Sequence, residues 1–394
     1  MAKSAPVRSE SMTDRAILHF TVNLLETHFP LQVCGYDCQT SDLWRVLVAS
    51  AARRSTVEAT CLDLEEVPAS NTIRHHLQEQ LATLEIPQLQ ECCNQVLQSQ
   101  VPDWLWQTAQ HKALDVALDL HDMPYYGKAD LHDPDHWICR GEADHGTTRF
   151  YRCATAYVIR RGVRVTLAVV FVSPTHSLVE VVQSLVGQVQ DLGIAVRRLY
   201  CDKAFCTVPV LRYLQQETAF SAIVAASLRG KAQGRGLRAR CRGRCSYRTT
   251  HTFASAEYGQ LSVPVGVVRT RAQRRDGSTR PQWLVYVLLR VEDPLPAVRE
   301  SYRLRFGIES SYRMLEAVRL CTTSNQAVRR FLSAGLALLL YNIRIALQWV
   351  YLRAPGAGPP RVVAKQLSLD RLTRLLTRAV EDIYGVITAI PPPS

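Results

Sequence analysis

The sequence predicts a mixed α/β protein in which an all-helical region precedes a sheet covered by helices. Residues 13–110 carry helical periodicity and capping signals. Three strand-like stretches follow, and beyond them helices and strands alternate, an order typical of a mixed α/β sheet. With 394 residues, of which 47% are hydrophobic, the chain is long enough for about two or three domains with substantial cores.

The N-terminal helices are predicted from their start and stop signals. The first is amphipathic and runs from Thr13 to His28. Three further helices are predicted from serines that serve as N-caps or open a capping box, which are Ser41, Ser55 and Ser70. The region is therefore expected to be a set of short helices.

Two of these helices are predicted to form a DNA-binding element. A tight turn at residues 66–68 separates them, and Asn71 and Arg74 lie near the start of the second, which fits helix-turn-helix geometry. A helical bundle with a polar face is the alternative. Lys and Arg outnumber Asp and Glu by 47 to 35, giving a net charge of +12, and this balance favours nucleic acid as the partner.

The predicted sheet begins with a short apolar strand at residues 116–122, which acidic residues interrupt. A hairpin follows, formed by residues 148–162 and 163–173, which are rich in β-branched and aromatic side chains. A helix is then predicted at residues 177–193, followed by a strand that ends at Asp202. A second helix at residues 207–217 and a strand at residues 219–227 come next.

A basic segment separates this part from the next helix. Its arginines alternate with glycines and no acid lies among them, as at Arg238, Arg240, Arg242 and Arg244. Such a segment is too charged to form a core, so we expect a solvated loop that follows DNA, with a merely disordered loop as the alternative. Residues 262–272 and 281–291 are predicted as a strand pair joined by a turn at residues 276–277.

Residues 302–320 are predicted to form a helix with an apolar back and a narrow polar front. On a helical wheel the ionisable side chains fall within a wedge of about 60–80° that also holds a tyrosine; these residues are Tyr302, Arg305, Glu309, Arg313 and Glu316. An acid beside arginines and a phenol is expected where a carboxylate and cations act together on one polyanionic ligand. Incidental ion pairs on an exposed face are the alternative.

The spacing of Tyr302, Arg305 and Glu309 resembles the Tyr-Arg-Glu signature of the DDE transposases of insertion sequences, within the IS-four superfamily and its ISH-three-like branch. Residues 116–128 resemble the first-strand motif of that family, in which an acid in an apolar run precedes a Pro-Tyr-Tyr-Gly turn. Residues 196–205 resemble its second-acid motif. The three motifs occur in the family's order.

The resemblance implies a ribonuclease-H-like core with a β-rich insertion, preceded by an all-α DNA-binding region. On this basis we expect a helical N-terminal region at residues 1–110 and a first part of the core at residues 111–228. A basic β-rich insertion follows at residues 229–295, and a second part of the core with the Tyr-Arg-Glu helix at residues 296–352. A linker with a C-terminal helix is expected at residues 353–394.

The resemblance implies that Asp119, Asp202 and Glu309 bind Mg²⁺ or Mn²⁺, as a pair of ions, and carry out catalysis. The residues support part of this set. Asp119 lies in an apolar strand, where an unpaired charge is costly, whereas Asp122 lies on the other face of a regular strand and is a weaker candidate. Asp202 ends its strand, where α/β sheets bind ligands, although a plain strand-end or helix-capping role is the alternative.

The DNA contacts implied by the resemblance are Tyr302 and Arg305. The family often carries a lysine seven residues after its glutamate, where this chain has Glu316, and we expect Arg313 to take its place. Trp283 lies in the insertion, where a transposase of this type can stack a displaced base, with a place in the strand core as the alternative.

The sequence therefore predicts a cut-and-paste DNA transposase, acting as an endonuclease and in DNA recombination. It would bind terminal inverted repeats, cleave their ends and join them to target DNA, as a homodimer in the synaptic complex. The alternatives are a ribonuclease-H-fold nuclease without strand transfer and a catalytically inactive, domesticated DNA-binding protein.

The expected location is cytoplasmic and nucleoid-associated, because residues 1–10 are polar and lack a signal-like apolar run. Residues 325–352 are apolar enough to resemble a membrane span. Polar side chains interrupt them at Asn342, Arg344 and Gln348, so we expect a buried core helix and no membrane contact.

Overall fold

The computed structural model describes residues 11–128, 133–144, 146–160, 163–231, 234, 236–273, 278–306, 316–353 and 362–389. The chain divides into two compact units. The helical unit comprises Met1–Trp106, Pro124–Tyr151 and Ser310–Ser394, and the sheet unit comprises Gln107–Met123 and Arg152–Glu309. The helical unit thus combines segments from both ends of the chain, and the linear domain boundaries expected from the sequence stay a prediction.

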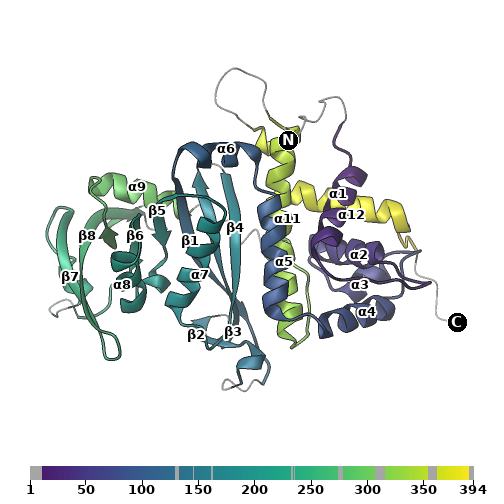
Figure 1. Cartoon of the computed structure of the whole chain (residues 1–394), viewed down its shortest axis with the longest axis horizontal. Coiled ribbons are helices and arrows are strands. Elements are labelled where there is room, and N and C mark those ends of the chain that lie inside the picture. Colours follow the sequence, from purple (N-terminus) through teal and green to yellow (C-terminus); the bar gives the residue numbers. More distant parts are fainter. Residues whose placement is uncertain are drawn as a thin grey trace. The chain divides into compact units, whose positions relative to one another are not determined.

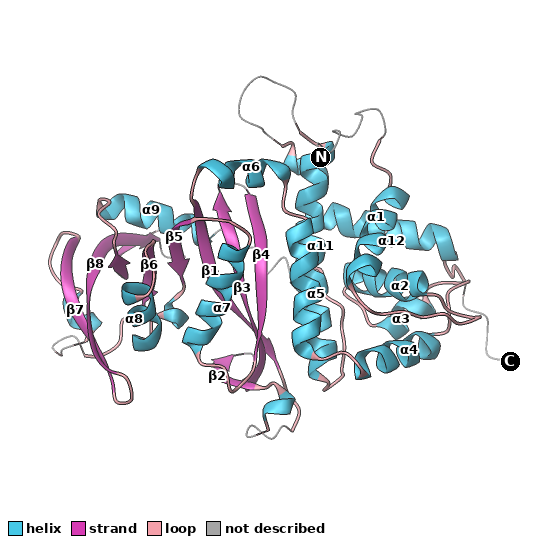
Figure 2. Ribbon diagram, in the orientation of Figure 1, coloured by secondary structure: helices cyan, strands magenta, loops and turns pink. Residues whose placement is uncertain are grey.

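The helical unit contains short amphipathic helices and one long apolar helix (Figure 2). Its α-helices are α1 (Asp14–His28), α2 (Thr40–Arg53), α3 (Val57–Leu62), α4 (Ser70–Ala82), α5 (Ile86–Ser99), α11 (Ala327–Tyr351) and α12 (Leu369–Tyr384), with 3-10 turns η1 (Pro134–His136) and η4 (Ala364–Leu367). Helix α6 (Asp103–His111) crosses the boundary between the units. Strand β2 (Cys139–Asp144) pairs with the first residues of β3 (Thr147–Arg160).

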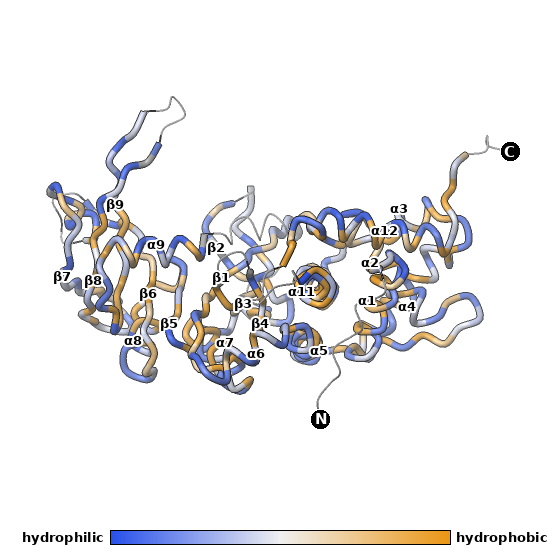
Figure 3. Tube along the Cα trace, turned by 90° about the horizontal axis from the view of Figure 1, so that it is seen from above, coloured by the Kyte–Doolittle hydropathy of each residue, from blue (hydrophilic) through white to orange (hydrophobic). Residues whose placement is uncertain are grey.

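The core of the helical unit forms around α11, which packs against α5 and α2. Figure 3, in which this helix is seen end-on, shows it as mostly hydrophobic. It is the one helix among the described residues that is long and apolar enough to cross a membrane, and 83% of the qualifying window is buried inside the protein. Asn342 is fully buried and donates its amide to the carbonyl of Leu97 at 3.5 Å. The helix is a core element, as its polar interruptions predict.

The C-terminal helix α12 packs on α1 and α2. Glu381 accepts a hydrogen bond from Arg53 at 2.6 Å, and the hydroxyl of Tyr384 donates to Asp42 at 2.6 Å. Its apolar face, including Leu372 and Leu376, is buried. The sequence leaves open whether this helix packs on the core or serves a dimer, and the structure shows it on the core of its own unit.

The predicted N-caps of three helices are wrong by one or two residues. Helices α2, α3 and α4 follow Gln39, Thr56 and Ala69 in place of the predicted serines. The segment between α3 and α4 spans residues 63–69, longer than the turn of about 3–4 residues in a helix-turn-helix. The prediction of a tight turn is therefore wrong, although a role of α4 in DNA binding stays a prediction.

The sheet unit contains a mixed sheet, so the prediction of a mixed α/β protein is confirmed (Figure 1). Its strands follow the order β3-β1-β5-β6-β9-β8-β7, and β4 pairs antiparallel with β3. Strands β1, β5 and β6 run parallel to one another. The bounds are β1 (Leu114–Pro124), β4 (Val163–Val172), β5 (Val196–Cys201), β6 (Ser221–Ala226), β7 (Tyr247–Ser255), β8 (Gly259–Gln273) and β9 (Thr279–Leu289).

Helices cover both faces of this sheet. Helices α7 (Leu178–Asp191) and α8 (Val208–Gln216) lie on one face, and α9 (Leu295–Phe306) lies on the other (Figures 1 and 3). Gly266 of β8 permits the close approach of α9, because a Cβ there would lie 2.6 Å from a methyl carbon of Leu295. Helix α7 begins with the capping box of Ser177 and Glu180.

The basic insertion adds β7, β8 and β9 to the edge of the sheet through antiparallel pairs. The predicted pair at residues 262–272 and 281–291 corresponds to β8 and β9. Strand β7 was not predicted, because its one arginine, Arg248, and its threonines follow the basic segment without a break. The expected turn at residues 276–277 lies outside the described residues.

Helix α9 presents the opposite face to the one expected. Tyr302 and Arg305 are 1% and 5% exposed and face the sheet, whereas Leu304, assigned to the apolar back, is 49% exposed. The helical wheel shows which residues share a face but not which face is buried. Beyond Phe306 the described chain resumes at Glu316, so Glu309 and Arg313 lie outside the described residues.

Candidate active site

The register of two parallel strands brings two predicted acids together. Leu118 of β1 pairs with Cys201 of β5, and Asp119 and Asp202 each follow by one residue. Paired residues of parallel strands point to the same face, so both acids lie at one point of the sheet. Neither carboxylate needs a long loop to reach the other.

Asp119 is a buried acid in an apolar strand, with 6% of its surface exposed. Burial raises the pKa of its carboxyl to about 6, against the lowering effects of Arg305 and Arg164 and with a further increase from Asp202. The backbone N–H of Leu120 donates to its Oδ1 at 3.1 Å. The carboxylate is thus held in place, partly dehydrated and close to a second acid.

Asp202 occupies the N-cap position of the 3-10 turn η2 (Lys203–Phe205). Its side chain makes no capping hydrogen bond within the described part of the chain, so the capping alternative is not what the structure shows. The side chain is about one-third exposed, in contrast to that of Asp119. Asp202 is therefore the acid of the pair that solvent reaches.

One guanidinium contacts both acids. Nη2 of Arg305 lies 2.9 Å from Oδ1 of Asp119, and Nη1 lies 3.6 Å from Oδ1 of Asp202. Burial alone would lower the pKa of this arginine, but Tyr302, Asp119, Tyr157 and Asp202 together raise it. Arg305 stays charged and supplies the cation that two neighbouring carboxylates require.

Tyr302 is part of the interior rather than of an exposed face. Its hydroxyl donates to the backbone carbonyl of Cys201 at 3.1 Å, and its ring packs against Tyr200 and Tyr286. Burial raises the pKa of the phenol, which stays protonated. The tyrosine therefore fixes α9 against β5, directly beside Asp202.

Two residues of this cluster were missed by the sequence prediction. The guanidinium of Arg164 in β4 lies 3.9 Å from the ring centre of Tyr157 in β3, and both residues are buried. The charge of Arg164 lowers the pKa of Asp119. Like Asp119, Arg164 is a charged residue in an apolar strand, and this pattern could have identified it. It was overlooked because it lies at the start of the strand, where charged residues are common.

Asp122 is held apart from this cluster by its own partner. Its two carboxylate oxygens accept hydrogen bonds from Nε and Nη2 of Arg152 at 2.6 and 2.8 Å. It follows Asp119 by three positions, which places it on the other face of a regular strand. The structure therefore favours Asp119 as the partner of Asp202.

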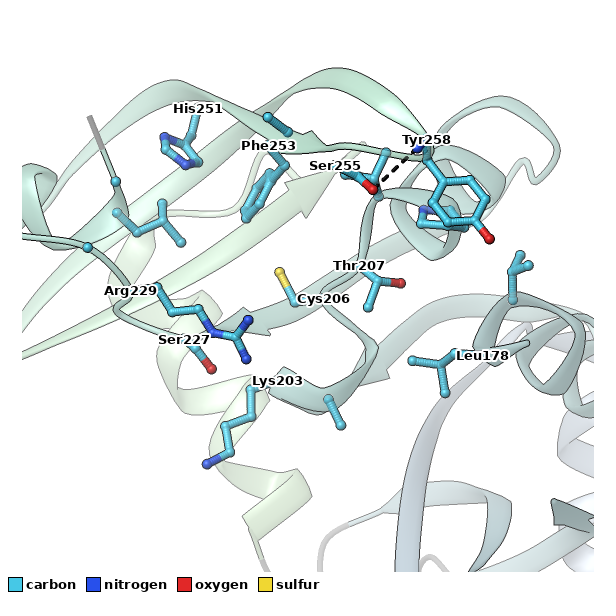
Figure 4. Close-up of a pocket in the computed structure, with 18 of the residues that line it drawn as sticks. Leu178, Lys203, Cys206, Thr207, Ser227, Arg229, His251, Phe253, Ser255 and Tyr258 are labelled. Atoms are coloured by element: carbon cyan, nitrogen blue, oxygen red, sulfur yellow. Dashed lines mark hydrogen bonds between the residues drawn. The ribbon is translucent and has the colours of Figure 1, made fainter. Parts of the chain in front are cut away.

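A cavity of about 810 Å³ lies at the C-terminal ends of β5 and β6, immediately after Asp202 (Figure 4). The figure shows the side chains of Lys203 and Arg229 near one another on one side, and His251 and Phe253 on the other. Burial lowers the pKa of His251, so this imidazole is neutral near pH 7. The cavity offers cations, aromatic rings and hydroxyls, and none of the described residues that line it is a carboxylate.

The arginines of the basic segment differ in their exposure to solvent. In the basic segment, Arg238, Arg242 and Arg244 are exposed and Arg240 is half-buried. The segment contains the 3-10 turn η3 (Leu237–Arg240), and Arg269 donates to the carbonyl of Arg244 at 3.0 Å.

The remaining predicted DNA contacts belong to both units. In the helical unit, Asn71 and Arg74 are exposed on α4, and Arg74 lies 3.9 Å from Glu58. Trp283 is partly exposed in β9 of the sheet unit, where it pairs with Arg269.

The donors of the acid pair are carboxylate oxygens, the ligand type that Mg²⁺ and Mn²⁺ prefer. Asp119 and Asp202 lie close enough for their Oδ1 atoms to contact the two terminal nitrogens of one guanidinium. Across the described residues no cluster of three His, Cys, Asp or Glu side chains is found, and the third predicted ligand, Glu309, lies outside them. The donor type of these two acids suits such an ion, and metal binding stays a prediction.

Comparison with solved structures finds a similar fold in a piggyBac transposase, in a structure of its synaptic complex with hairpin DNA. The TM-score is 0.52 at 11% sequence identity, over 98% of this chain and 83% of that chain. No family model and no curated protein matches the sequence. The chain therefore has a transposase-like fold.

Proposed function

We propose that the protein is a DNA transposase of the DDE type, which cleaves the ends of an insertion sequence and transfers them to target DNA. The observation that carries the proposal is the pair of acids on adjacent parallel strands, Asp119 and Asp202, held by the guanidinium of Arg305. Paired carboxylates, one within a strand and one directly after the end of its neighbour, suit phosphodiester chemistry because they can bind divalent cations.

The sheet supports the ribonuclease-H-like core that the resemblance implies. Three leading strands lie side by side, and β5 and β6 follow on the other side of β1, each after a helix. The insertion of β7–β9 precedes α9, as expected between the second and third acids. The sequence motifs at residues 116–128, 196–205 and 302–309 further support assignment to the IS-four superfamily.

The proposed cofactor is Mg²⁺ or Mn²⁺, held by Asp119, Asp202 and Glu309. Such ions activate the attacking oxygen and stabilise charge on the leaving oxygen. Arg305 keeps Asp119 ionised in its buried place, and Tyr302 positions the helix that carries Arg305. The greater exposure of Asp202 leaves the DNA side of the pair open.

DNA contacts are proposed for the groups around the site. The basic residues of the cavity beside Asp202, Lys203 and Arg229, suit a phosphate of the cleaved strand. The four predicted arginines of the basic segment suit the duplex further along. We further propose that the terminal inverted repeats are held by a homodimer, and that the protein acts in the nucleoid.

The proposal is tested by supplying the purified protein with a terminal-repeat duplex, a supercoiled plasmid target and Mg²⁺. The inverted repeats are identified as matching sequences on both sides of the coding region. We expect strand cleavage at the repeat ends and a joined product in the plasmid. Cleavage without joining would indicate a nuclease, and binding without cleavage would indicate an inactive DNA-binding protein; either result would overturn the proposal.

A further inference from the structure

A second cavity, of about 690 Å³, lies in the helical unit. The loop that follows β1 forms one side, and the segment before α11 forms the other. We call it the tyrosine–arginine pocket and define it by the lining residues Tyr126, Lys128, Arg319, Thr322, Thr323 and Arg330. Its volume falls within the range of about 300–1,000 Å³ that is usual for small-ligand sites.

The tyrosine side of this pocket is rigidly built. Tyr125 is buried, and its backbone N–H donates to the carbonyl of Arg149 at 2.9 Å. Arg149 in turn donates to the carbonyl of Gly127 at 3.0 Å. A Cβ at Gly127 would lie 2.3 Å from the hydroxyl oxygen of Tyr125, so only glycine fits there. These contacts fix the loop, and they leave Tyr126 71% exposed at its tip.

The arginine side gathers positive charge, and no carboxylate is among the described residues that line the pocket. Arg330 is held by a hydrogen bond from its Nε to the carbonyl of Ser324 at 2.7 Å. Burial lowers the pKa of this guanidinium, and the charge of Arg319 lowers it further. Neither of these arginines nor Lys128 forms an ion pair with any residue that the structure describes.

Like charges that converge in a cleft repel one another, and an anion bound between them relieves the repulsion. Phosphate suits this role because guanidinium groups bind it with charge-assisted hydrogen bonds. An exposed tyrosine ring at the rim adds a flat surface on which a base can stack. The pocket therefore combines the two features of a site for single-stranded nucleic acid.

We propose that the tyrosine–arginine pocket binds an unpaired nucleotide of a DNA strand, with its base on Tyr126 and its neighbouring phosphates at Lys128, Arg319 and Arg330. A base inside a duplex is covered by its neighbours, so only an unpaired base offers a face to the ring. The inference rests on the proposed function, because cleavage and transfer of DNA ends is what brings such strands to this protein.

The test is the affinity of the full-length protein for a fluorescein-labelled single-stranded DNA of about 12 nucleotides, within the usual range of site sizes. Fluorescence anisotropy is measured in EDTA, so that no cleavage occurs. Tyr126→Ala removes the ring, and Tyr126→Phe keeps it. Arg319→Ala removes one cation, and Arg374→Ala is its control, because Arg374 is an exposed arginine of α12 in the same unit.

We expect Tyr126→Ala to weaken binding by about five- to a hundredfold, the effect of losing one stacked base. Tyr126→Phe should bind like the wild type. Arg319→Ala should reduce the slope of log Kd against log salt by about 0.7, because one phosphate would no longer be neutralised. Arg374→Ala should leave the slope unchanged. Thermal melts of all variants establish that they are folded.

Wild-type affinity in Tyr126→Ala would overturn the proposal, as would an equal loss in Tyr126→Phe, because the ring would then not be the contact. An equal loss for a duplex of the same sequence would also overturn it. Tighter binding of the matching RNA would assign the pocket to RNA instead of DNA.

This outcome is separable from that of the proposed function. If the wild type neither cleaves nor joins terminal-repeat DNA but the stacking result holds, the transposase proposal fails and the pocket stands. If end cleavage is normal and Tyr126→Ala binds single strands normally, the pocket proposal fails alone.

Discussion

The acid pair of the sheet unit and the tyrosine–arginine pocket of the helical unit differ in whether their charged side chains have partners of opposite charge. In the first, Arg305 contacts both carboxylates, and the charges of Arg305 and Asp119 are buried and compensate each other. In the second, Arg319 and Arg330 lie close enough for one to lower the pKa of the other, and the lining residues that the structure describes include no carboxylate.

The difference distinguishes charged residues that stabilise the folded state from charged residues that are available to bind a ligand. A buried charge without its partner costs several kcal/mol, so the Arg305–Asp119 pair is part of the folded state. A partly exposed cation without an ion-pair partner contributes little to folding and is better explained by binding. Substitutions in the two regions should therefore change stability to very different extents.

Arg305→Leu should lower the free energy of unfolding by about 3–5 kcal/mol, because Asp119 would remain buried without its cation. Urea unfolding followed by circular dichroism measures the change. Arg303→Ala is the control, since Arg303 is an exposed residue of α9 and should change stability by less than about 0.5 kcal/mol. Equal effects of the two substitutions would show that the pair does not stabilise the fold.

Tyr302→Phe should lower the free energy of unfolding by about 1 kcal/mol, the usual value of one buried hydrogen bond. Binding of terminal-repeat DNA should change little, because the hydroxyl faces Cys201. Unfolding and gel-shift experiments on one preparation distinguish the roles. Unchanged stability together with impaired DNA binding would restore the DNA contact that the resemblance implies.

Replacing Arg238, Arg240, Arg242 and Arg244 by Ala should weaken DNA binding for all sequences. The slope of log K against log salt should flatten by up to about 0.9 for each phosphate that the protein no longer neutralises. Arg374→Ala with Arg378→Ala provides a control among exposed arginines of α12. An unchanged slope would mean that the basic segment does not contact DNA.

Arg319→Gln should leave the free energy of unfolding unchanged or raise it by up to about 0.5 kcal/mol, because it removes repulsion toward Arg330 without breaking an ion pair. Urea unfolding, carried out beside Arg305→Leu, makes the contrast direct. A decrease of more than about 1 kcal/mol would place Arg319 among the charges that hold the fold.

Much of the sheet can be predicted because its strands are apolar and its acids interrupt them. Asp119 is recognisable as a charge in a strand, and Asp202 as the residue that ends one. Their closeness follows from the parallel register of β1 and β5, which a single sequence does not reveal.

The features that the sequence does not predict depend on tertiary packing. Helical periodicity places Tyr302 and Arg305 together but assigns their face to solvent, because charge usually indicates exposure. Arg164 is hidden beside a turn, and β7 within an arginine-rich stretch. The pocket around Tyr126 joins segments that are far apart in the sequence, and no local pattern indicates such a meeting.

Whether Asp202 belongs to a metal-dependent cleavage site is decided by end cleavage in Asp202→Asn. Terminal-repeat duplex is incubated with Mg²⁺ and wild type, Asp202→Asn or the exposed control Asp191→Asn, and gel shifts report binding in parallel. We predict that Asp202→Asn abolishes cleavage while its DNA affinity stays within a few-fold, and that Asp191→Asn behaves like the wild type. Full cleavage by folded Asp202→Asn would remove this acid from the catalytic site and with it the basis of the proposed function.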